Sequence, residues 1–176
     1  MSYLCGQMFQ IMKTNTLTQQ LDEAINTFAK NVEIKQNLKT NIVNLTYQKF
    51  FSLKYLIVLA IRDGIPFNLF NMIKQVTPFT DEDWTAFLGL SAKSLQRYKL
   101  QRDFRFKPIH TEKIIEVAEV TNFGVSVFDT LDKFKLWLNT PNFALGSSKP
   151  IEMIKNSYGK ELVMAELTRI DHGIFV

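Results

Sequence analysis

Residues 80–99, TDEDWTAFLGLSAKSLQRYK, predict two short helices joined by a tight turn. Thr80 and Asp83 have the spacing of a capping box, in which each side chain accepts a hydrogen bond from the backbone N–H of the other residue. Gly89 is placed to end the first helix, because glycine adopts the left-handed conformation at low cost. The apolar face of this helix is expected to consist of Trp84, Phe87 and Leu88.

The second helix of this stretch is predicted to begin after Ser91, a favourable N-cap residue, and to run to about Gln101. Leu95 and Tyr98 would face inward, and Leu90 in the turn would hold the two helices together. Two helices around a glycine-containing turn are the arrangement of a helix-turn-helix, whose second helix enters the major groove of DNA.

The outward side of the second helix carries residue types that contact DNA. Glutamine can pair with adenine, arginine can pair with guanine, and basic side chains neutralise phosphates. The candidate DNA-binding residues are Lys93, Ser94, Gln96, Arg97 and Lys99, followed by Arg102, Arg105 and Lys107, which are placed to meet phosphates. A net charge of only +4 therefore hides a local concentration of positive charge. The alternative interpretation is a helical hairpin with a solvated basic face.

The chain before residue 80 also has apolar residues at helical intervals. One apolar stripe consists of Leu17, Leu21, Ile25 and Phe28. The polar stretch 31–44 is interpreted as a loop or a short helix, and β-prone residues around 41–51 give a weak indication of a strand. A helix is predicted for 52–63, where Gly64 would end it in the left-handed conformation, and Pro66 suits the first turn of the next helix.

The chain after residue 101 continues as helices separated by turn-forming residues. A linker at 102–110 is followed by a long helix capped by Thr111 and another helix capped by Thr130. Further turns and helix ends are expected at Pro141, Gly146, Pro150, Gly159 and Gly173. The predicted fold is therefore all-α, a helical bundle with a helix-turn-helix and a small C-terminal helical domain.

The bulk composition is that of a globular protein that needs no disulfide or metal. Hydrophobic residues make up 46% of the chain, which leaves ample material for a core. The single cysteine, Cys5, cannot form an internal disulfide, and His110 and His172 show no ligand spacing. No secretory signal is recognised, and the apolar run 55–61 is too short to cross a bilayer. We expect a cytoplasmic protein without a cofactor and without a membrane contact.

Residues 137–146, WLNTPNFALG, form the most distinctive sequence motif of the chain. Further along stand Pro150-Ile151, Gly159 and the closing run LTRIDHG at 167–173. Together with the upstream helix-turn-helix, in which Leu95 and Arg97 are in place, these residues resemble the Xre/MbcA/ParS antitoxins over about residues 61–176. The departures from that pattern are Ser147 for a second glycine, Asn156-Ser157-Tyr158 for a threonine-acidic run, and Asp171 for glutamate.

The resemblance implies an antitoxin of a type II toxin–antitoxin system. Such antitoxins accompany RES-domain toxins that consume NAD, block the toxin's active-site cleft with the C-terminal region, and repress their own promoter. The implied toxin-binding residues are Arg169, Asp171, His172, Gly173, Ile174, Phe175 and Val176. Alternatives remain open, because Arg169 could form an intramolecular ion pair and His172 could compensate the helix dipole. Trp137 and Leu145 are expected to be core residues rather than contacts.

No residue pattern indicates an enzyme. The chain has no G-x-x-x-x-G-K loop, and the carboxylates Asp81, Glu82 and Asp83 are explained by their place at a helix N-terminus. The alternative function is a stand-alone helix-turn-helix regulator whose C-terminal domain only dimerises. A homodimer is expected in either case, because symmetric operators require one.

Three segments are predicted along the chain. Residues 1–50 would form a helical arm, 51–129 the helix-turn-helix region, and 130–176 the toxin-binding domain.

Overall fold

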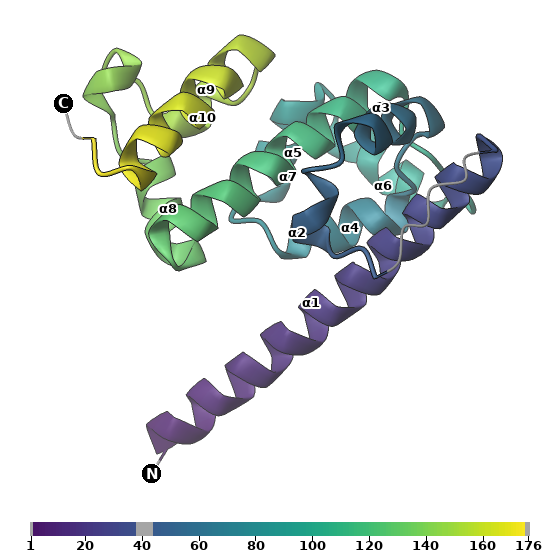
Figure 1. Ribbon diagram of the computed structural model, residues 1–176, viewed down its shortest axis with the longest axis horizontal. Coiled ribbons are helices and arrows are strands. Elements are labelled where there is room, and N and C mark those ends of the chain that lie inside the picture. Colours follow the sequence, from purple (N-terminus) through teal and green to yellow (C-terminus); the bar gives the residue numbers. More distant parts are fainter. Residues whose placement is uncertain (1, 38–43, 175–176) are drawn as a thin grey trace. The chain divides into compact units, whose positions relative to one another are not determined.

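A computed structural model describes the backbone of residues 2–37 and 44–174, with side chains of the first helix described from Thr16 onward. The regular elements of these residues are helices (Figure 1), which confirms the predicted all-α fold. Where a weak strand tendency was predicted, the described residues instead form the short helix α2 (Tyr47–Phe50), which Thr46 caps through its side chain.

The chain divides into two compact units. Unit 1 comprises residues 1–76 together with 105–108, and unit 2 comprises 77–104 together with 109–176. This grouping differs from the three predicted segments, because residues on both sides of position 50 lie in unit 1. The three predicted segments themselves stay a prediction.

Unit 1 is built from α1 (Ser2–Lys35), α2, α3 (Lys54–Asp63) and α4 (Phe67–Gln75). Helix α1 packs against α3 and α4. It extends to Lys35, through residues that were predicted to leave the helix as a loop or a new short helix. The reason is that the buried stripe does not stop at Phe28, since Val32 follows one turn later and is fully buried.

The segment 105–108 belongs to unit 1 through a close contact with Gly64. The ring of Phe106 packs between Phe67 and Phe70, with centroids 6.0 and 5.0 Å away. Gly64 has φ +82° and ψ 133°, so its conformation is positive in φ but not the left-handed helical one that was predicted. A β-carbon at Gly64 would collide with the Phe106 carbonyl oxygen, and this contact is a second reason for glycine there.

Unit 2 contains the helices that carry the candidate sites, except that Pro108, the first residue of α7, is grouped with unit 1. They are α5 (Asp81–Leu88), α6 (Ala92–Leu100), α7 (Pro108–Phe128), α8 (Leu131–Leu138), the 3₁₀ helix η1 (Phe143–Leu145), α9 (Pro150–Met153) and α10 (Ser157–Asp171). Helix α7 begins at Pro108, not after Thr111 as predicted, because proline is well suited to the first helical position. Thr111 lies inside this helix and is buried.

Two glycines let the C-terminal helices of unit 2 approach closely. A β-carbon at Gly124 on α7 would overlap the buried ring of Phe134 on α8. A β-carbon at Gly159 on α10 would overlap the backbone carbonyl of Met153 at the end of α9. The core of this region then closes around fully buried Phe134, Leu138, Ile154, Val163 and Leu167.

The search for membrane-spanning helices covered only the described residues, and none of their helices has the length and apolar character that crossing a bilayer requires.

Candidate functional site

The helix, glycine turn and helix of residues 80–100 form as predicted. Thr80 Oγ1 accepts a hydrogen bond from the Asp83 N–H at 3.1 Å, and Asp83 Oδ2 accepts one from the Thr80 N–H at 2.9 Å. Gly89 adopts the left-handed conformation at φ +60° and ψ 33°. Ser91 then caps α6 by accepting a hydrogen bond from the Ser94 N–H. These local contacts set the direction in which α6 leaves the turn.

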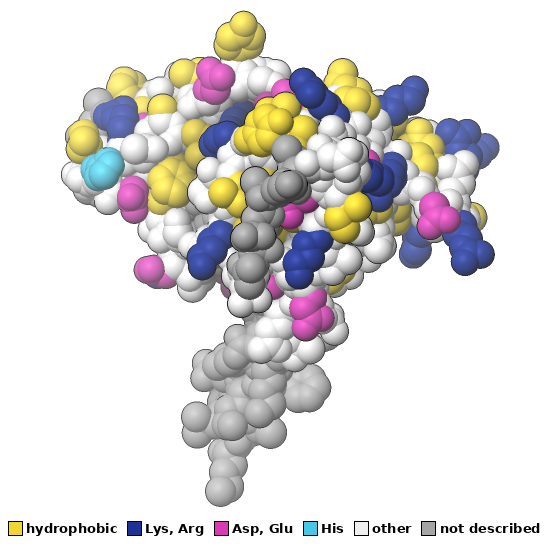
Figure 2. Space-filling model, turned by 45° about the vertical axis from the view of Figure 1, so that its right-hand side comes forward, with side chains coloured by type: hydrophobic (Ala, Val, Ile, Leu, Met, Phe, Trp, Pro, Cys, Tyr) yellow, Lys and Arg dark blue, Asp and Glu magenta, His cyan; other side chains and the backbone are white. Residues whose placement is uncertain are grey.

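Helix α6 presents most of its predicted DNA-binding residues to solvent. Lys93, Gln96, Arg97 and Lys99 are exposed, whereas Ser94 is half-buried and engaged with Ser91. The Arg97 guanidinium lies 5.4 Å from the centre of the Tyr98 ring, which itself stacks on Phe104 at 4.0 Å. Leu95 and Tyr98 face inward as predicted but are only half-buried. Figure 2 shows basic and hydrophobic side chains interspersed on the face that it draws.

The three basic residues beyond α6 do not share one role. Arg102 and Lys107 are exposed. Arg105 instead donates from Nη1 to Asp63 Oδ2 at 2.6 Å and to the Gly64 carbonyl at 2.9 Å, and Asp63 also pairs with Lys35. Arg105 therefore ties residues 105–108 to the rest of unit 1, and its contacts do not favour the predicted role at a phosphate.

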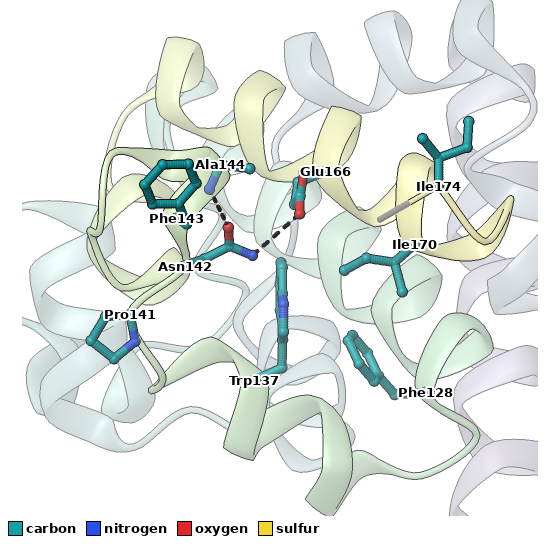
Figure 3. A pocket seen from close by; sticks show the side chains of 9 residues that line it. All are labelled: Phe128, Trp137, Pro141, Asn142, Phe143, Ala144, Glu166, Ile170 and Ile174. Carbon is teal, nitrogen blue, oxygen red and sulfur yellow. Dashed lines mark hydrogen bonds between the residues drawn. The ribbon is translucent and has the colours of Figure 1, made fainter. Parts of the chain in front are cut away.

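The distinctive run 137–146 begins in the last turn of α8 and continues as a loop through η1, and this loop is tied to α10. Asn142 caps η1 by accepting a hydrogen bond from the Ala144 N–H at 2.8 Å. Its backbone N–H donates to the Ser148 carbonyl, and its side-chain Nδ2 donates to Glu166 Oε1 at 3.3 Å (Figure 3). Gly146 ends η1 with φ +65°. Asn142 therefore closes the loop on itself and also ties it to α10.

The two residues of this run that were expected in the core differ in burial. Leu145 is 6% exposed, which confirms its core position. Trp137 is only half-buried, and its ring lies 6.0 Å from that of Phe134 and 5.5 Å from that of Phe128. One part of the Trp137 ring therefore packs on the core while another part faces a hollow.

That hollow is a pocket of about 400 Å³ within unit 2. Its walls come from the end of α7, from α8, from the loop at 141–144 and from α10, and they include Phe128, Trp137, Asn142, Phe143, Glu166 and Ile170 (Figure 3). Phe143 and Ile174 line it and are 83% and 55% exposed, respectively. An open pocket beside exposed apolar side chains is the kind of surface that receives a partner.

The predicted toxin-binding residues lie at the end of α10, next to this pocket. Arg169 Nη1 lies 3.2 Å from Glu166 Oε2, so the alternative of an intramolecular ion pair is the one observed. Asp171, His172, Gly173 and Ile174 are exposed, and His172 is the C-cap of α10. Phe175 and Val176 lie outside the described residues.

The link between Asn142 and Glu166, and the pocket beside it, did not follow from sequence reasoning. Asn142 signalled a local cap, because asparagine readily accepts a hydrogen bond from the backbone two residues on. Nothing in the sequence pairs it with Glu166, which is 24 residues away. Among the described residues, no group of histidine, cysteine, aspartate or glutamate is arranged to hold a metal ion.

Comparison with known proteins assigns the part of the chain that carries this pocket. Residues 124–173 match the C-terminal toxin-binding domain of the antitoxins Xre, MbcA and ParS. An antitoxin Xre of Yersinia enterocolitica is 32% identical over 89 residues, which are 49% of this chain and 59% of that protein. An antitoxin Xre of Photorhabdus laumondii is 25% identical over 115 residues, which are 65% of this chain and 77% of that protein.

The class of protein that these matches point to, for the part of the chain that they cover, is an antitoxin. The chain resembles the Xre/MbcA/ParS antitoxins over residues 124–173, as the run at 137–146 predicted. It spans about three fifths of the length of the Yersinia relative, 59%.

Proposed function

We propose that this protein neutralises a RES-domain, NAD-consuming toxin by covering the toxin's active-site cleft with its C-terminal region, and that it represses its own promoter through α5 and α6. The observation that carries the proposal is the position of the pocket. Most of its lining lies within residues 124–173, the segment that matches a toxin-binding domain. The pocket and the domain match therefore coincide.

The apolar side chains around the pocket support the toxin-binding half of the proposal. Phe143 and Ile174 each expose a large apolar area to solvent. Removing apolar surface from water contributes about 25 cal/mol per Å² of favourable free energy, so a partner that covers these side chains gains from the contact. Arg169 and Asp171 would stand at the edge of the contact. Arg169 keeps its ion pair with Glu166 and so would help to shape the surface.

The exposed basic residues of α6 support the DNA-binding half. Gln96 and Arg97 stand on the solvent side of the helix, where they could reach base edges, and Lys93, Lys99 and Arg102 surround them. We further propose that the protein binds DNA as a homodimer in the cytoplasm, because two-fold operators match two-fold proteins.

Co-expression with the cognate RES-domain toxin that this proposal requires tests the toxin-binding half. We expect the antitoxin to restore growth and to co-purify with the toxin. A variant that lacks residues 173–176 and carries Arg169→Ala should lose both effects, because it lacks the apolar and the charged part of the contact. The variant Gln96→Ala/Arg97→Ala serves as the matched control and should neutralise normally. Full neutralisation by the truncated variant would show that the C-terminal end does not cover the toxin.

The second candidate function is a regulator whose C-terminal domain only dimerises. The same exposed apolar side chains favour it, since a second copy could cover them as well as a toxin could. The two functions separate in one measurement. A regulator of this kind would form dimers in sedimentation velocity and bind promoter DNA, but would leave the RES-domain protein active.

A further inference from the structure

The pocket of unit 2 has two chemically different sides. The rings of Phe128 and Trp137 and the side chain of Ile170 form the apolar side, and Asn142 and Glu166 form the polar side (Figure 3). An occupant that satisfies both sides needs a flat apolar body with a polar atom at one edge. Tyrosine and tryptophan side chains have this construction, and they are common anchors of protein interfaces.

The polar side of the pocket determines which polar atom the occupant carries. Asn142 has already used its side-chain carbonyl on Ala144 and one N–H on Glu166. A carboxylate offers roughly four acceptor positions, and Glu166 uses one on Asn142 and one on Arg169. Acceptor capacity on Glu166 and one Nδ2–H of Asn142 therefore remain, so an occupant can donate a hydrogen bond to Glu166, and a hydroxyl can also accept one from Asn142.

The charges at the pocket disfavour ionic occupants. An anion would lie beside the Glu166 carboxylate, whose side chain is only 13% exposed and poorly screened. A second guanidinium or ammonium would lie beside Arg169, which already balances that carboxylate at 3.2 Å. A neutral donor avoids both repulsions.

We propose that this pocket receives one tyrosine or tryptophan side chain of the toxin, with its ring against Trp137 and its O–H or N–H directed to Glu166. This inference rests on the proposed function, because it names the part of the toxin that the domain binds. The pocket volume of about 400 Å³ leaves room for one such side chain.

Filling the pocket from its rim tests the inference without removing a core residue. Ala144 lines the pocket and is exposed, so Ala144→Phe adds bulk where the occupant would lie. Ala165 is an exposed alanine on α10 that does not line the pocket, and Ala165→Phe is the matched control. We expect Ala144→Phe to weaken RES-domain toxin binding by about 30-fold or more, the effect of losing a central anchor, and Ala165→Phe to stay within about twofold.

Fluorine NMR gives a second readout that reports the pocket directly. The chain has two tryptophans, and antitoxin labelled with 5-fluorotryptophan would therefore show two resonances. Trp137 lines the pocket, whereas Trp84 is fully buried elsewhere. Unlabelled toxin should shift the Trp137 resonance and leave that of Trp84 in place.

The outcomes separate this inference from the proposed function. Suppose that the wild-type antitoxin binds the toxin and that Ala144→Phe binds it equally well, or that the Trp137 resonance does not move. Either result would show that the pocket does not receive a toxin side chain, and it would overturn this inference but not the proposed function. If the Trp137 resonance shifts with antitoxin concentration and not with toxin, a second copy occupies the pocket and the inference is overturned. If the wild type does not bind the toxin, both fail.

A second variant pair keeps the test decisive if Ala144→Phe does not fold. Phe143 and Tyr158 are exposed to 83% and 84%, so truncating either should not unfold the domain. Phe143→Ala removes the rim of the pocket and should weaken toxin binding severalfold, whereas Tyr158→Ala should not. Equal binding by the two variants would overturn the inference.

Discussion

Helix α6 and the pocket at α8 and α10 belong to the same unit, yet they would recognise partners by opposite physical means. Helix α6 has no fully buried residue and presents charged and amide groups to solvent. The pocket is walled by aromatic rings, and its one carboxylate is already balanced by Arg169. One small unit therefore holds both an electrostatic surface and an apolar surface. The affinity of the first for DNA should depend on ionic strength more than the affinity of the second for the toxin.

Ionic strength should separate the two surfaces most strongly. If a dimer places about six basic side chains on phosphates, raising salt from 50 to 200 mM should lower DNA affinity by on the order of 10³-fold. Toxin affinity should change by less than about threefold, because the pocket exchanges no net charge. Titrations of both partners at matched salt concentrations measure this, and parallel losses would contradict the contrast.

Removing base-reading groups from α6 should give the next largest effect. Gln96→Ala/Arg97→Ala should weaken binding to its own promoter by at least about 30-fold, since each good bidentate contact discriminates by about 1–3 kcal/mol. Binding to unrelated DNA should fall much less. Mobility-shift titrations at physiological salt check this, with Lys155→Ala, an exposed basic residue outside α5 and α6, as the control. Unchanged promoter binding would remove α6 from the role of recognition helix.

Adding one methyl group at Gly159, where α10 meets the end of α9, should destabilise the protein. Gly159→Ala collides with the Met153 carbonyl, a backbone group that cannot turn away, and should cost about 3 kcal/mol. Gly89→Ala meets open space and suffers only from its positive φ, which costs about 1–2 kcal/mol. Chemical denaturation compares the two, and an equal loss would mean that α10 shifts easily on α9.

Removing the arginine of the 105–108 segment should have the smallest effect. It should lower the free energy of unfolding and leave the affinity for DNA unchanged. Arg105→Ala breaks the contacts with Asp63 and the Gly64 carbonyl, and because the pair is partly exposed the loss should be about 1 kcal/mol. Arg102→Ala should do the reverse, with stability kept and DNA binding weakened severalfold. Thermal unfolding and DNA titration of both variants distinguish the two roles.

Features that depend on neighbouring residues could be predicted from the sequence. The capping box at Thr80, the left-handed turn at Gly89 and the Ser91 cap were all predicted, because each is completed within four residues of chain. The run at 137–146 likewise predicted the antitoxin family. The predicted end of α1 was wrong, because the burial of one further residue, Val32, keeps the chain helical through a stretch of polar composition.

Features that join distant residues could not be predicted. Arg105 had the charge and position of a phosphate contact, but it pairs with Asp63, 42 residues earlier. Trp137 was expected in the core, but it lies half-buried beside a pocket whose other walls come from Phe128 and Ile170.

The sequence by itself determined that this protein is helical, where several of its helices start and stop, and which antitoxin family its C-terminal part resembles. Those properties follow from local hydrogen bonding, apolar periodicity and a recognisable run of residues. Only the tertiary structure decided which charged side chains are free to meet a partner and which are already paired, and where a pocket opens. Both depend on which helices pack together, and that packing brings side chains tens of residues apart within hydrogen-bonding distance.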